Sequence, residues 1–241
     1  MGENHHQLPP AKVVALWRFP FKSMLGEQLE QLHLGLRGAD DDRLFALREK
    51  ATHKLVTARQ QPQLLMHQAR VGSRGVEIVR PDGTCLSAED PRLVEHFSAE
   101  FGRKLELARA FSERDPEGLF DDSGILLVSN QSLSTLAAAR PESDFDRRRF
   151  RANIWIDWPQ PADFPEQQWL HKTISVGDEV RLHVDKLCER CVMTTHAQSD
   201  LERDYQILKT ITQMNDAALG IYCSIISGGT IKTGDLVRPV D

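Results

Sequence analysis

The segment Glu179-Val180-Arg181-Leu182-His183-Val184 decides the fold class, because apolar and polar side chains alternate along it. Alternation with a period of two is typical of a β-strand that buries one of its faces. Similar short segments, each closed by Gly, Pro or charged turn residues, occupy 13–19, 29–34, 43–48, 54–57 and 76–80. The sequence therefore predicts a mainly β protein with β-barrel sheets and a few short helices.

A polar and acidic segment, residues 112–124, contains Gly and Pro and is typical of a surface connection. It predicts a boundary between two β-rich domains. We expect an N-terminal β-barrel domain over 12–112 and a second domain over 120–241. The polar residues 1–11 are expected to be disordered.

Apolar residues at helical spacing predict three short helices. The first begins at Asp90-Pro91, which combines a capping residue with a proline in the first turn. The other two are expected at about 132–139 and about 200–211, where Ser or Asp can cap the exposed N–H groups.

Composition and charge limit the classes of function. Of the 241 residues, 40% are hydrophobic and 27% are charged, which is typical of a protein with a substantial core. Lys and Arg number 30 against 35 Asp and Glu, and this net charge of −5 disfavours nucleic acid polymers as partners. No apolar stretch approaches the ~20 residues that cross a bilayer, and no apolar signal core is present. We therefore expect a cytoplasmic protein without a membrane partner, and its four Cys are too few for a disulfide framework.

Two thiols and a guanidinium share the loop Cys188-Glu189-Arg190-Cys191-Val192-Met193-Thr194-Thr195. A neighbouring Arg lowers the pKa of a thiol in general and so favours the thiolate. The thiolate is the form that attacks as a nucleophile or binds a soft metal. This loop is therefore the first candidate for chemistry.

Four interpretations of this loop stay open. Both Cys can be small buried hydrophobes. A structural zinc site would need Cys188, Cys191 and His196 together with Cys223 or His183. A thioredoxin-like pair would need βαβ surroundings, whereas the expected surroundings are β. In the last interpretation Cys191 alone binds a metal, and a cofactor supplies the other ligands.

The cofactor interpretation predicts anion-holding groups elsewhere, because metal-carrying organic cofactors usually bring a phosphate. Lys22-Ser23 lies at a strand end, Arg59 lies in a turn, and Arg149-Phe150-Arg151-Ala152-Asn153 leads into a strand. Ser129-Asn130-Gln131-Ser132 opens a helix, where free N–H groups favour a phosphate. Each motif alone is more typical of an exposed charged residue at a strand end, or of an ordinary N-cap, than of an anion site.

Several other catalytic motifs are missing from the sequence. It contains no Gly-x-Gly-x-x-Gly or Walker-type loop, no Gly-x-Ser-x-Gly elbow and no His-Glu-x-x-His pair. These absences disfavour nucleotide-cofactor enzymes and the corresponding hydrolases.

Taken together, the motifs resemble the MOSC family, whose members carry an N-terminal β-barrel domain followed by the domain named for the molybdenum cofactor sulfurase C-terminus. In the first half the resemblance lies in 19–26 (FPFKSMLG), Asp42-Arg43 and 55–62 (LVTARQQP). In the second half it lies in 149–154 (RFRANI), Trp169 with 174–178 (ISVGD), 190–195 (RCVMTT) and 220–235. Within the family, the chain looks most like the mitochondrial amidoxime-reducing component and its bacterial counterparts.

The resemblance implies a molybdenum cofactor, molybdopterin with Mo, in the cleft between the two domains. Cys191 matches the family's catalytic thiolate and molybdenum ligand. Asp42 and Arg43 are interpreted either as a structural ion pair or as part of the substrate entrance. The implied cofactor-binding residues are Lys22, Ser23, Arg59, Ser129, Ser132, Arg151, Asn153, Arg190 and Thr194.

The implied reaction is a two-electron reduction of amidoximes and other N-hydroxylated compounds to amidines or amines and water. Because the sequence ends at Asp241 without the Cys-rich ferredoxin extension of some bacterial relatives, we expect electrons from a separate ferredoxin- or flavin-type reductase. Two alternatives stay open. Cys191 could carry sulfur as a persulfide supplied by a pyridoxal-phosphate desulfurase, or the protein could bind or deliver the cofactor without catalysis.

Overall fold

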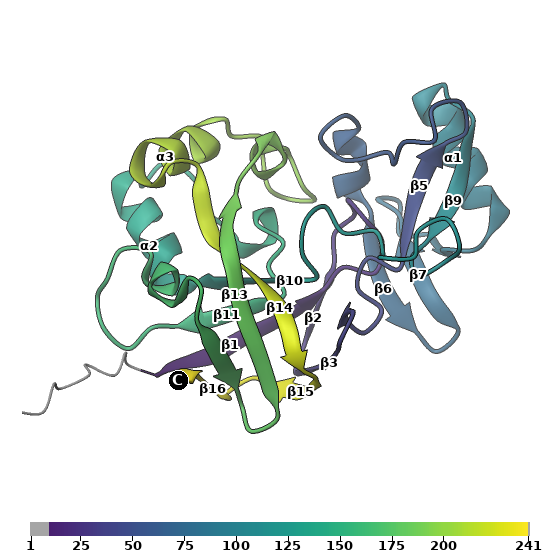
Figure 1. Cartoon of the computed structure of the whole chain (residues 1–241). Coiled ribbons are helices and arrows are strands. Elements are labelled where there is room, and N and C mark those ends of the chain that lie inside the picture. The colour runs from purple at the N-terminus through teal and green to yellow at the C-terminus, as the bar shows by residue number, and fades with distance from the viewer. Residues whose placement is uncertain (1–9, 241) are drawn as a thin grey trace, which may run out of the picture.

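A closed barrel forms the larger lobe of the molecule, which the computed structural model describes over residues 10–240 (Figure 1). Seven strands follow one another in the order β11-β10-β14-β13-β12-β16-β1, and β11 pairs again with β1 to close the sheet. All neighbours are antiparallel except β10 and β11. The strands are β1 (Ala11–Arg18), β10 (Ile125–Ser129), β11 (Ile154–Asp157), β12 (Thr173–Val176), β13 (Val180–Glu189), β14 (Ala218–Ser227) and β16 (Leu236–Val240). The predicted mainly β class is confirmed.

The smaller lobe packs two short sheets and one helix around Phe21, Phe45, Leu47 and Phe97. One sheet pairs β5 (Phe45–Glu49) with β9 (Leu105–Arg109), and the other orders β6 (Gln68–Gly72), β7 (Gly75–Val79) and β8 (Cys85–Ser87). A third short sheet combines β15 (Gly229–Lys232), β3 (Gln31–Gly35) and β4 (Gly38–Ala39), and β2 (Glu27–Leu29) pairs with β1. Figure 1 shows the two lobes side by side.

Strand β1 belongs to the barrel although it comes first in the chain. Its edges pair with β11 and β16, and Ala11, Val13 and Leu16 lie in the barrel core. The barrel therefore includes a strand from the segment 12–112, which was predicted as a separate domain. The sequence could not show this pairing, because a two-residue period predicts that a strand forms but not which strand it pairs with. Disorder was predicted for residues 1–11, of which residues 1–9 lie outside the described part of the chain, as does residue 241. Ala11, the last residue of that predicted segment, is instead the first residue of β1.

The first two helices lie close to their predicted positions. Helix α1 (Pro91–Phe101) begins after Asp90, whose side chain accepts a hydrogen bond from the Arg92 amide at 2.9 Å. Helix α2 (Asn130–Ala139) begins after Ser129, which accepts from the Gln131 amide at 3.1 Å. The expected capping chemistry fixes both helix starts.

Helix α3 (Gln206–Asn215) begins six residues later than the predicted start at 200. Gln198 and Leu201 exchange backbone hydrogen bonds in an isolated bridge, which excludes a helix there. Asp204 then accepts from the Gln206 amide at 2.8 Å and marks the actual start. The local bridge between Gln198 and Leu201 therefore delays the start of the helix beyond the predicted residue 200.

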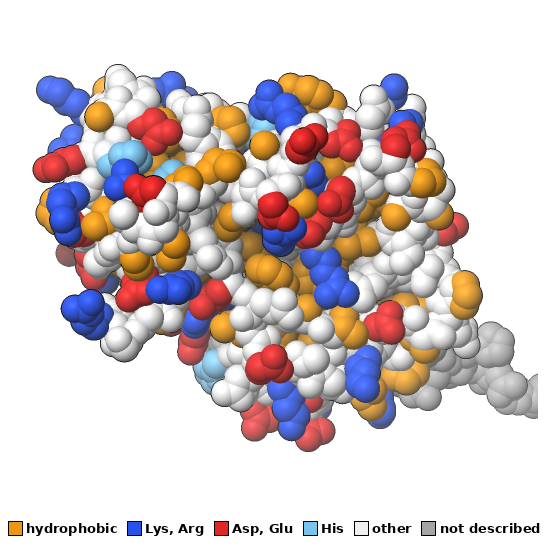
Figure 2. Space-filling model, turned by 180° about the vertical axis from the view of Figure 1, so that it is seen from behind, with side chains coloured by type: hydrophobic (Ala, Val, Ile, Leu, Met, Phe, Trp, Pro, Cys, Tyr) orange, Lys and Arg blue, Asp and Glu red, His pale blue; other side chains and the backbone are white. Residues whose placement is uncertain are grey.

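Acidic and basic side chains are interspersed over the face that Figure 2 shows. Over residues 10–240, no helix is long and apolar enough to cross a membrane.

Candidate functional site

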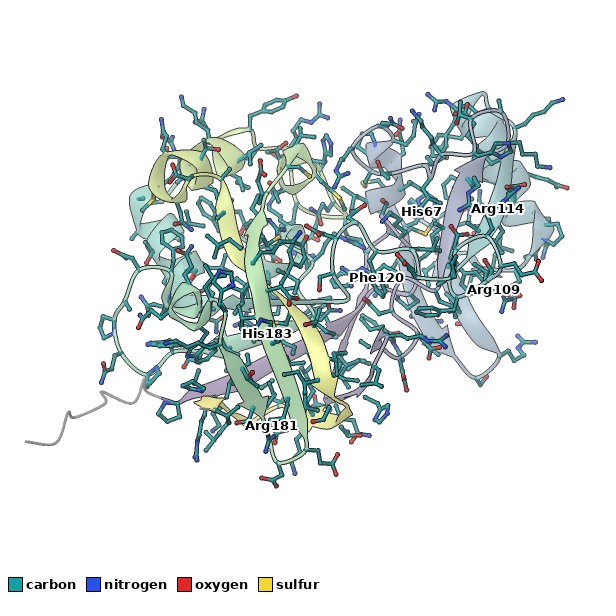
Figure 3. The ribbon with its side chains drawn as sticks, in the orientation of Figure 1. His67, Arg109, Arg114, Phe120, Arg181 and His183 are labelled. Atoms are coloured by element: carbon teal, nitrogen blue, oxygen red, sulfur yellow. The ribbon has the colours of Figure 1, made fainter. Side chains whose placement is uncertain are left out.

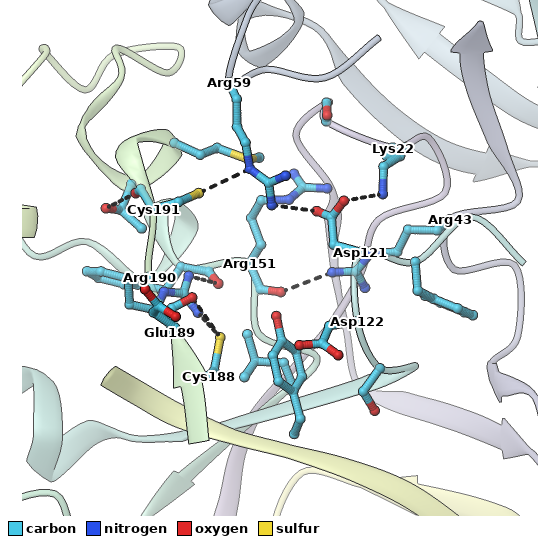
Figure 4. Close-up of a pocket in the computed structure, with 18 of the residues that line it drawn as sticks. Lys22, Arg43, Arg59, Asp121, Asp122, Arg151, Cys188, Glu189, Arg190 and Cys191 are labelled. Carbon is cyan, nitrogen blue, oxygen red and sulfur yellow. Dashed lines mark hydrogen bonds and ion pairs between the residues drawn. The ribbon is translucent and has the colours of Figure 1, made fainter. Parts of the chain in front are cut away.

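A pocket between the two lobes contains most of the predicted functional residues (Figure 4). Its walls come from the loop after β1, the turn before η1 (Pro62–Met66), the connection before β10, the loop before β11 and the end of β13. Phe120, in that connection, lies between the lobes in Figure 3. The predicted residues that line the pocket are Lys22, Ser23, Arg59, Arg151, Asn153, Arg190, Cys191 and Thr194.

Cys191 is the partly exposed thiol of this pocket. It lies directly before η4 (Val192–Thr195), and the Thr194 hydroxyl donates to its carbonyl at 3.0 Å. Arg59, from the other lobe, donates through Nε to the Cys191 sulfur at 3.4 Å. That hydrogen bond is the main reason why the pKa of Arg59 is raised. The two lobes therefore meet at the sulfur atom.

Cys188 is buried and has an Arg partner of its own. Arg190 donates to the Cys188 sulfur at 3.0 Å and to the Phe150 carbonyl at 2.6 Å. The Nε atom of Arg190 is buried and has no hydrogen-bond partner within residues 10–240. One donor at the pocket wall is thus left without an acceptor.

The zinc interpretation lacks a ligand set in this part of the chain. Within residues 10–240, no three His, Cys, Asp or Glu side chains are grouped as a metal site would require. His183, one of the ligands that a zinc site would have needed, lies on the barrel strand β13 (Figure 3) and does not line the pocket.

Lys22 supplies a buried cation to the pocket. Its Nζ donates to the Leu119 carbonyl at 2.7 Å and pairs with Asp121 at 2.8 Å. Burial lowers the pKa of Lys22, and the attraction of Asp121 only partly opposes this effect. An anion that replaced or joined Asp121 here would meet a poorly solvated ammonium group. The electrostatic attraction between the two charges is stronger at such a site than at the surface.

Arg43 and Arg151 form a second cationic wall. Arg43 donates to the Arg151 carbonyl and to the Asn153 side-chain oxygen, both at 3.3 Å, and it pairs with Asp42. Arg151 has a backbone φ of 55° and donates to the Met24 carbonyl. The interpretation of Asp42 and Arg43 as an ion pair is confirmed. Arg43 also lines the pocket, and a role of the pair at the substrate entrance stays a prediction.

Asp121 is a pocket residue that the sequence reasoning missed. It lies in the connection over 112–124, for which only a surface role was predicted, yet it bridges Lys22 and Arg59 at 2.8 and 3.4 Å. Burial alone would raise the pKa of Asp121, but Lys22, Arg59 and Arg151 outweigh burial and hold it below its usual range. The available signal was an acidic pair, Asp121-Asp122, immediately upstream of a buried strand.

Tyr222 was also missed. It lines the pocket from β14, and burial, followed by the nearby Cys188, raises the pKa of its hydroxyl. That hydroxyl therefore keeps its proton at neutral pH and is available as a hydrogen-bond donor.

Ser129 and Ser132 do not line the pocket. Ser129 caps α2, as the ordinary interpretation of this motif predicted, and the Ser132 hydroxyl donates to Glu166 at 2.6 Å. Glu166, in η3 (Pro165–Trp169), is fully buried, and burial raises its pKa to about 7. A carboxyl group of the protein itself therefore lies beside the start of α2, and the binding of a cofactor by Ser129 and Ser132 stays a prediction.

The pocket residues fit a phosphate-bearing cofactor. Six cationic residues line a space that also holds a thiol, and one of their donors has no acceptor among the described residues. Guanidinium and ammonium groups of this kind bind phosphate oxygens, and a thiol suits a soft metal. The cations are Lys22, Arg43, Arg59, Arg149, Arg151 and Arg190, and the guanidinium of Arg149 already donates to three backbone carbonyls.

Comparison with known families identifies the class of this protein. The MOSC domain model matches residues 96–238, and the model of the MOSC N-terminal beta barrel domain matches residues 10–101. The chain belongs to the MOSC family, a molybdenum-cofactor-binding family, and the predicted resemblance is confirmed at this level. The finer resemblance to amidoxime-reducing proteins stays a prediction.

Two individual proteins are similar to this chain. A protein of Drosophila ananassae named molybdenum cofactor sulfurase is 31% identical over 154 residues, which are 60% of this chain and 19% of that protein. The chain thus spans about a fifth of the length of this curated relative. The crystal structure of the YUAD protein from Bacillus subtilis covers 96% of both chains with a TM-score of 0.54 at 15% identity, and it supports the fold alone.

Proposed function

We propose that this protein binds a molybdenum cofactor between its lobes and reduces N-hydroxylated compounds such as amidoximes with electrons from a separate protein. The observation that carries the proposal is the meeting of the Cys191 sulfur with Arg59 at 3.4 Å inside a pocket walled by cations. This pocket offers a metal ligand and an anion site within one space. Cofactor enzymes need both, because the protein positions the group that performs the hard step.

Five of the pocket residues have a defined task in the proposal. Cys191 binds the metal, while Lys22, Arg43 and Arg151 neutralise the phosphate-bearing end of the cofactor. When bound, the cofactor supplies two-electron redox chemistry. The overall reaction converts an N–OH group, two electrons and two protons into N–H and water. The protonated hydroxyl of Tyr222 lies in the same pocket and can donate a hydrogen bond to a bound group.

The decisive variant is Cys191→Ala. We expect the wild type, purified from a host that makes the cofactor, to contain nearly one molybdenum per chain and to reduce an aromatic amidoxime with a chemical or enzymatic electron donor. Cys191→Ala should stay folded and lose both molybdenum and turnover. Cys85→Ala is the matched control, because Cys85 is an exposed thiol of the smaller lobe. Turnover by Cys191→Ala would refute the proposal.

The electron donor is proposed to be a ferredoxin- or flavin-type reductase. The partly exposed Cys191 and the half-exposed Arg59 place the sulfur near the protein surface, where a partner can approach. Turnover with purified reductases of each type, at equal concentration, identifies the class of donor. Activity that a chemical reductant supports and no reductase supports would contradict this part of the proposal.

Sulfur transfer is the second candidate, because the Drosophila ananassae relative is named as a molybdenum cofactor sulfurase. In this reaction a desulfurase cysteine persulfide would pass its outer sulfur to the Cys191 thiolate, which would hand it to an acceptor. Mass spectrometry after incubation with a pyridoxal-phosphate desulfurase and cysteine tests this candidate. A sulfur atom added to Cys191, in protein without molybdenum, would favour transfer over reduction. Bound cofactor without turnover with any reductant would instead favour a binding or delivery protein.

A further inference from the structure

Phe19 is a buried aromatic residue behind the pocket wall, with two guanidinium groups on its ring. The Cζ atom of Arg151 lies 4.3 Å from the ring centroid, and the Cζ atom of Arg43 lies 4.9 Å from it. The side chain of Phe19 is only 2% exposed and does not line the pocket, whereas both Arg residues do. The two guanidinium groups therefore link the ring of Phe19 to the pocket.

We propose that Phe19 is a positioning residue that holds Arg43 and Arg151 for an anionic ligand of the phosphate or pyrophosphate class. The inference rests on the proposed cofactor site and adds a residue that touches neither the cofactor nor the substrate. The face of an aromatic ring carries negative electrostatic potential and attracts cations, most strongly where water is excluded. A single ring that contacts both guanidinium groups fixes them close together in spite of their mutual repulsion.

The backbone of Phe19 is tied to the same pair of cations. Its amide donates to Asp42 Oδ1 at 2.7 Å, and its carbonyl accepts from the Arg43 amide at 2.8 Å. The second carboxylate oxygen of Asp42 pairs with the Arg43 guanidinium. Ring, backbone and carboxylate therefore set the position of Arg43 from three directions.

Gly26 leaves the space that the ring occupies. A Cβ atom at position 26 would lie 2.5 Å from Cδ1 of Phe19 and 2.2 Å from the Arg18 carbonyl oxygen, so only glycine fits without rearrangement. In the same loop, the Met24 carbonyl accepts a hydrogen bond from Arg151. The loop from 19 to 26 thus contacts Arg151 through both the aromatic ring and the backbone.

The test compares Phe19→Leu with Phe19→Tyr in full-length protein prepared from a host that cannot make the cofactor. Inorganic pyrophosphate is the probe, and calorimetry measures its dissociation constant. Leu keeps an apolar side chain and removes the ring, and we expect about tenfold weaker binding from the loss of two buried cation–π contacts. Tyr keeps the ring and should bind within about twofold of the wild type.

Phe21→Leu is the matched control. Phe21 lies two residues further along, is fully buried in the core of the smaller lobe, and stacks on Phe45 with no guanidinium over its own ring in the described part of the chain. The variant Phe21→Leu should lower the melting temperature of the protein without changing its affinity for pyrophosphate. A second readout is non-additivity: Phe19→Leu combined with Arg151→Lys should weaken binding by less than the product of the two single effects.

The outcomes separate the inference from the function on which it rests. Wild-type affinity in Phe19→Leu, or full additivity with Arg151→Lys, would overturn the role of Phe19 and leave the proposed function standing. Equal weakening by Phe19→Leu and Phe21→Leu would also overturn it, because the effect would then follow stability. A wild type that does not bind pyrophosphate would overturn the anion site itself, and the proposed function with it.

Discussion

Glu166→Gln should remove a pH dependence of stability that is built into the barrel. Glu166 is fully buried, and the Ser132 hydroxyl donates to one of its oxygens at 2.6 Å. The other oxygen, Oε1, has no hydrogen-bond partner within residues 10–240. Burial therefore raises the pKa of Glu166 to about 7, against 4.5 for an ordinary Glu, although the hydrogen bond from Ser132 opposes this change.

The sign of the effect follows from the raised pKa. Between pH 4.5 and about 7, the folded protein keeps a proton on Glu166 that the unfolded chain has released. Raising the pH therefore favours unfolding, so the stabilising contribution is fully present below the unfolded pKa and is lost by about pH 7. At about 1.4 kcal/mol per pH unit, the loss approaches roughly 3 kcal/mol. Gln carries no titrating proton and can still accept the hydrogen bond from Ser132.

Chemical denaturation at several pH values checks this reasoning. The quantity measured is the free energy of unfolding of the wild type minus that of Glu166→Gln, because the subtraction removes other titrating groups. It should fall by about 3 kcal/mol between about pH 5 and about pH 8. Glu95→Gln, at an exposed position on α1, is the control and should show a flat difference. A flat difference for Glu166→Gln would refute the reasoning.

Two further variants test packing and the second thiol. Gly220→Ala should cost about 3 kcal/mol in thermal denaturation, because its φ is 85° and a Cβ would lie 2.5 Å from Val128 Cγ2. Gly83→Ala is the control, because Gly83 has a φ of 82° and a Cβ there would have no neighbouring atom within 4 Å; it should cost only about 1 kcal/mol. Equal costs for the two variants would show that the contact with Val128 is unimportant. Cys188→Ala should keep bound molybdenum and most of the turnover, because Cys188 is buried against Arg190. Elemental analysis measures the bound metal, and its loss in this variant would contradict the assignment of Cys191 as the metal ligand.

The local parts of the site could be predicted from the sequence because they depend on residues close together in the chain. The loop from 188 to 195 identified Cys191, and short motifs at strand ends identified Lys22, Arg59 and Arg151. Each motif alone was more typical of an exposed charge than of an anion site. Their meeting in one pocket depends on the long-range pairing of β1 with β11 and β16, which a strand period does not encode.

The failures have the same physical origin. Ser132 was predicted to hold an anion, but a carboxylate from 34 residues further along fills the place beside it. Asp121 was overlooked because its segment has the composition of an ordinary surface connection, although folding turns it into the pocket between two cations. In both cases the sequence showed the donor or acceptor and concealed its partner, because the partner is set by tertiary structure.

The pocket is a joint product of the two lobes, and this arrangement couples ligand binding to their contact. Arg59 comes from the smaller lobe, Arg151 and Arg190 come from the barrel side, and Asp121 offsets part of their charge from the connection between the lobes. An anion held by these groups would bring their charges into balance and add its binding free energy to the folded arrangement. Loss of one cation therefore weakens more than one contact, because Arg59 joins both the Cys191 sulfur and Asp121. Changes at the junction should consequently act on ligand affinity and on the stability of the lobe contact together.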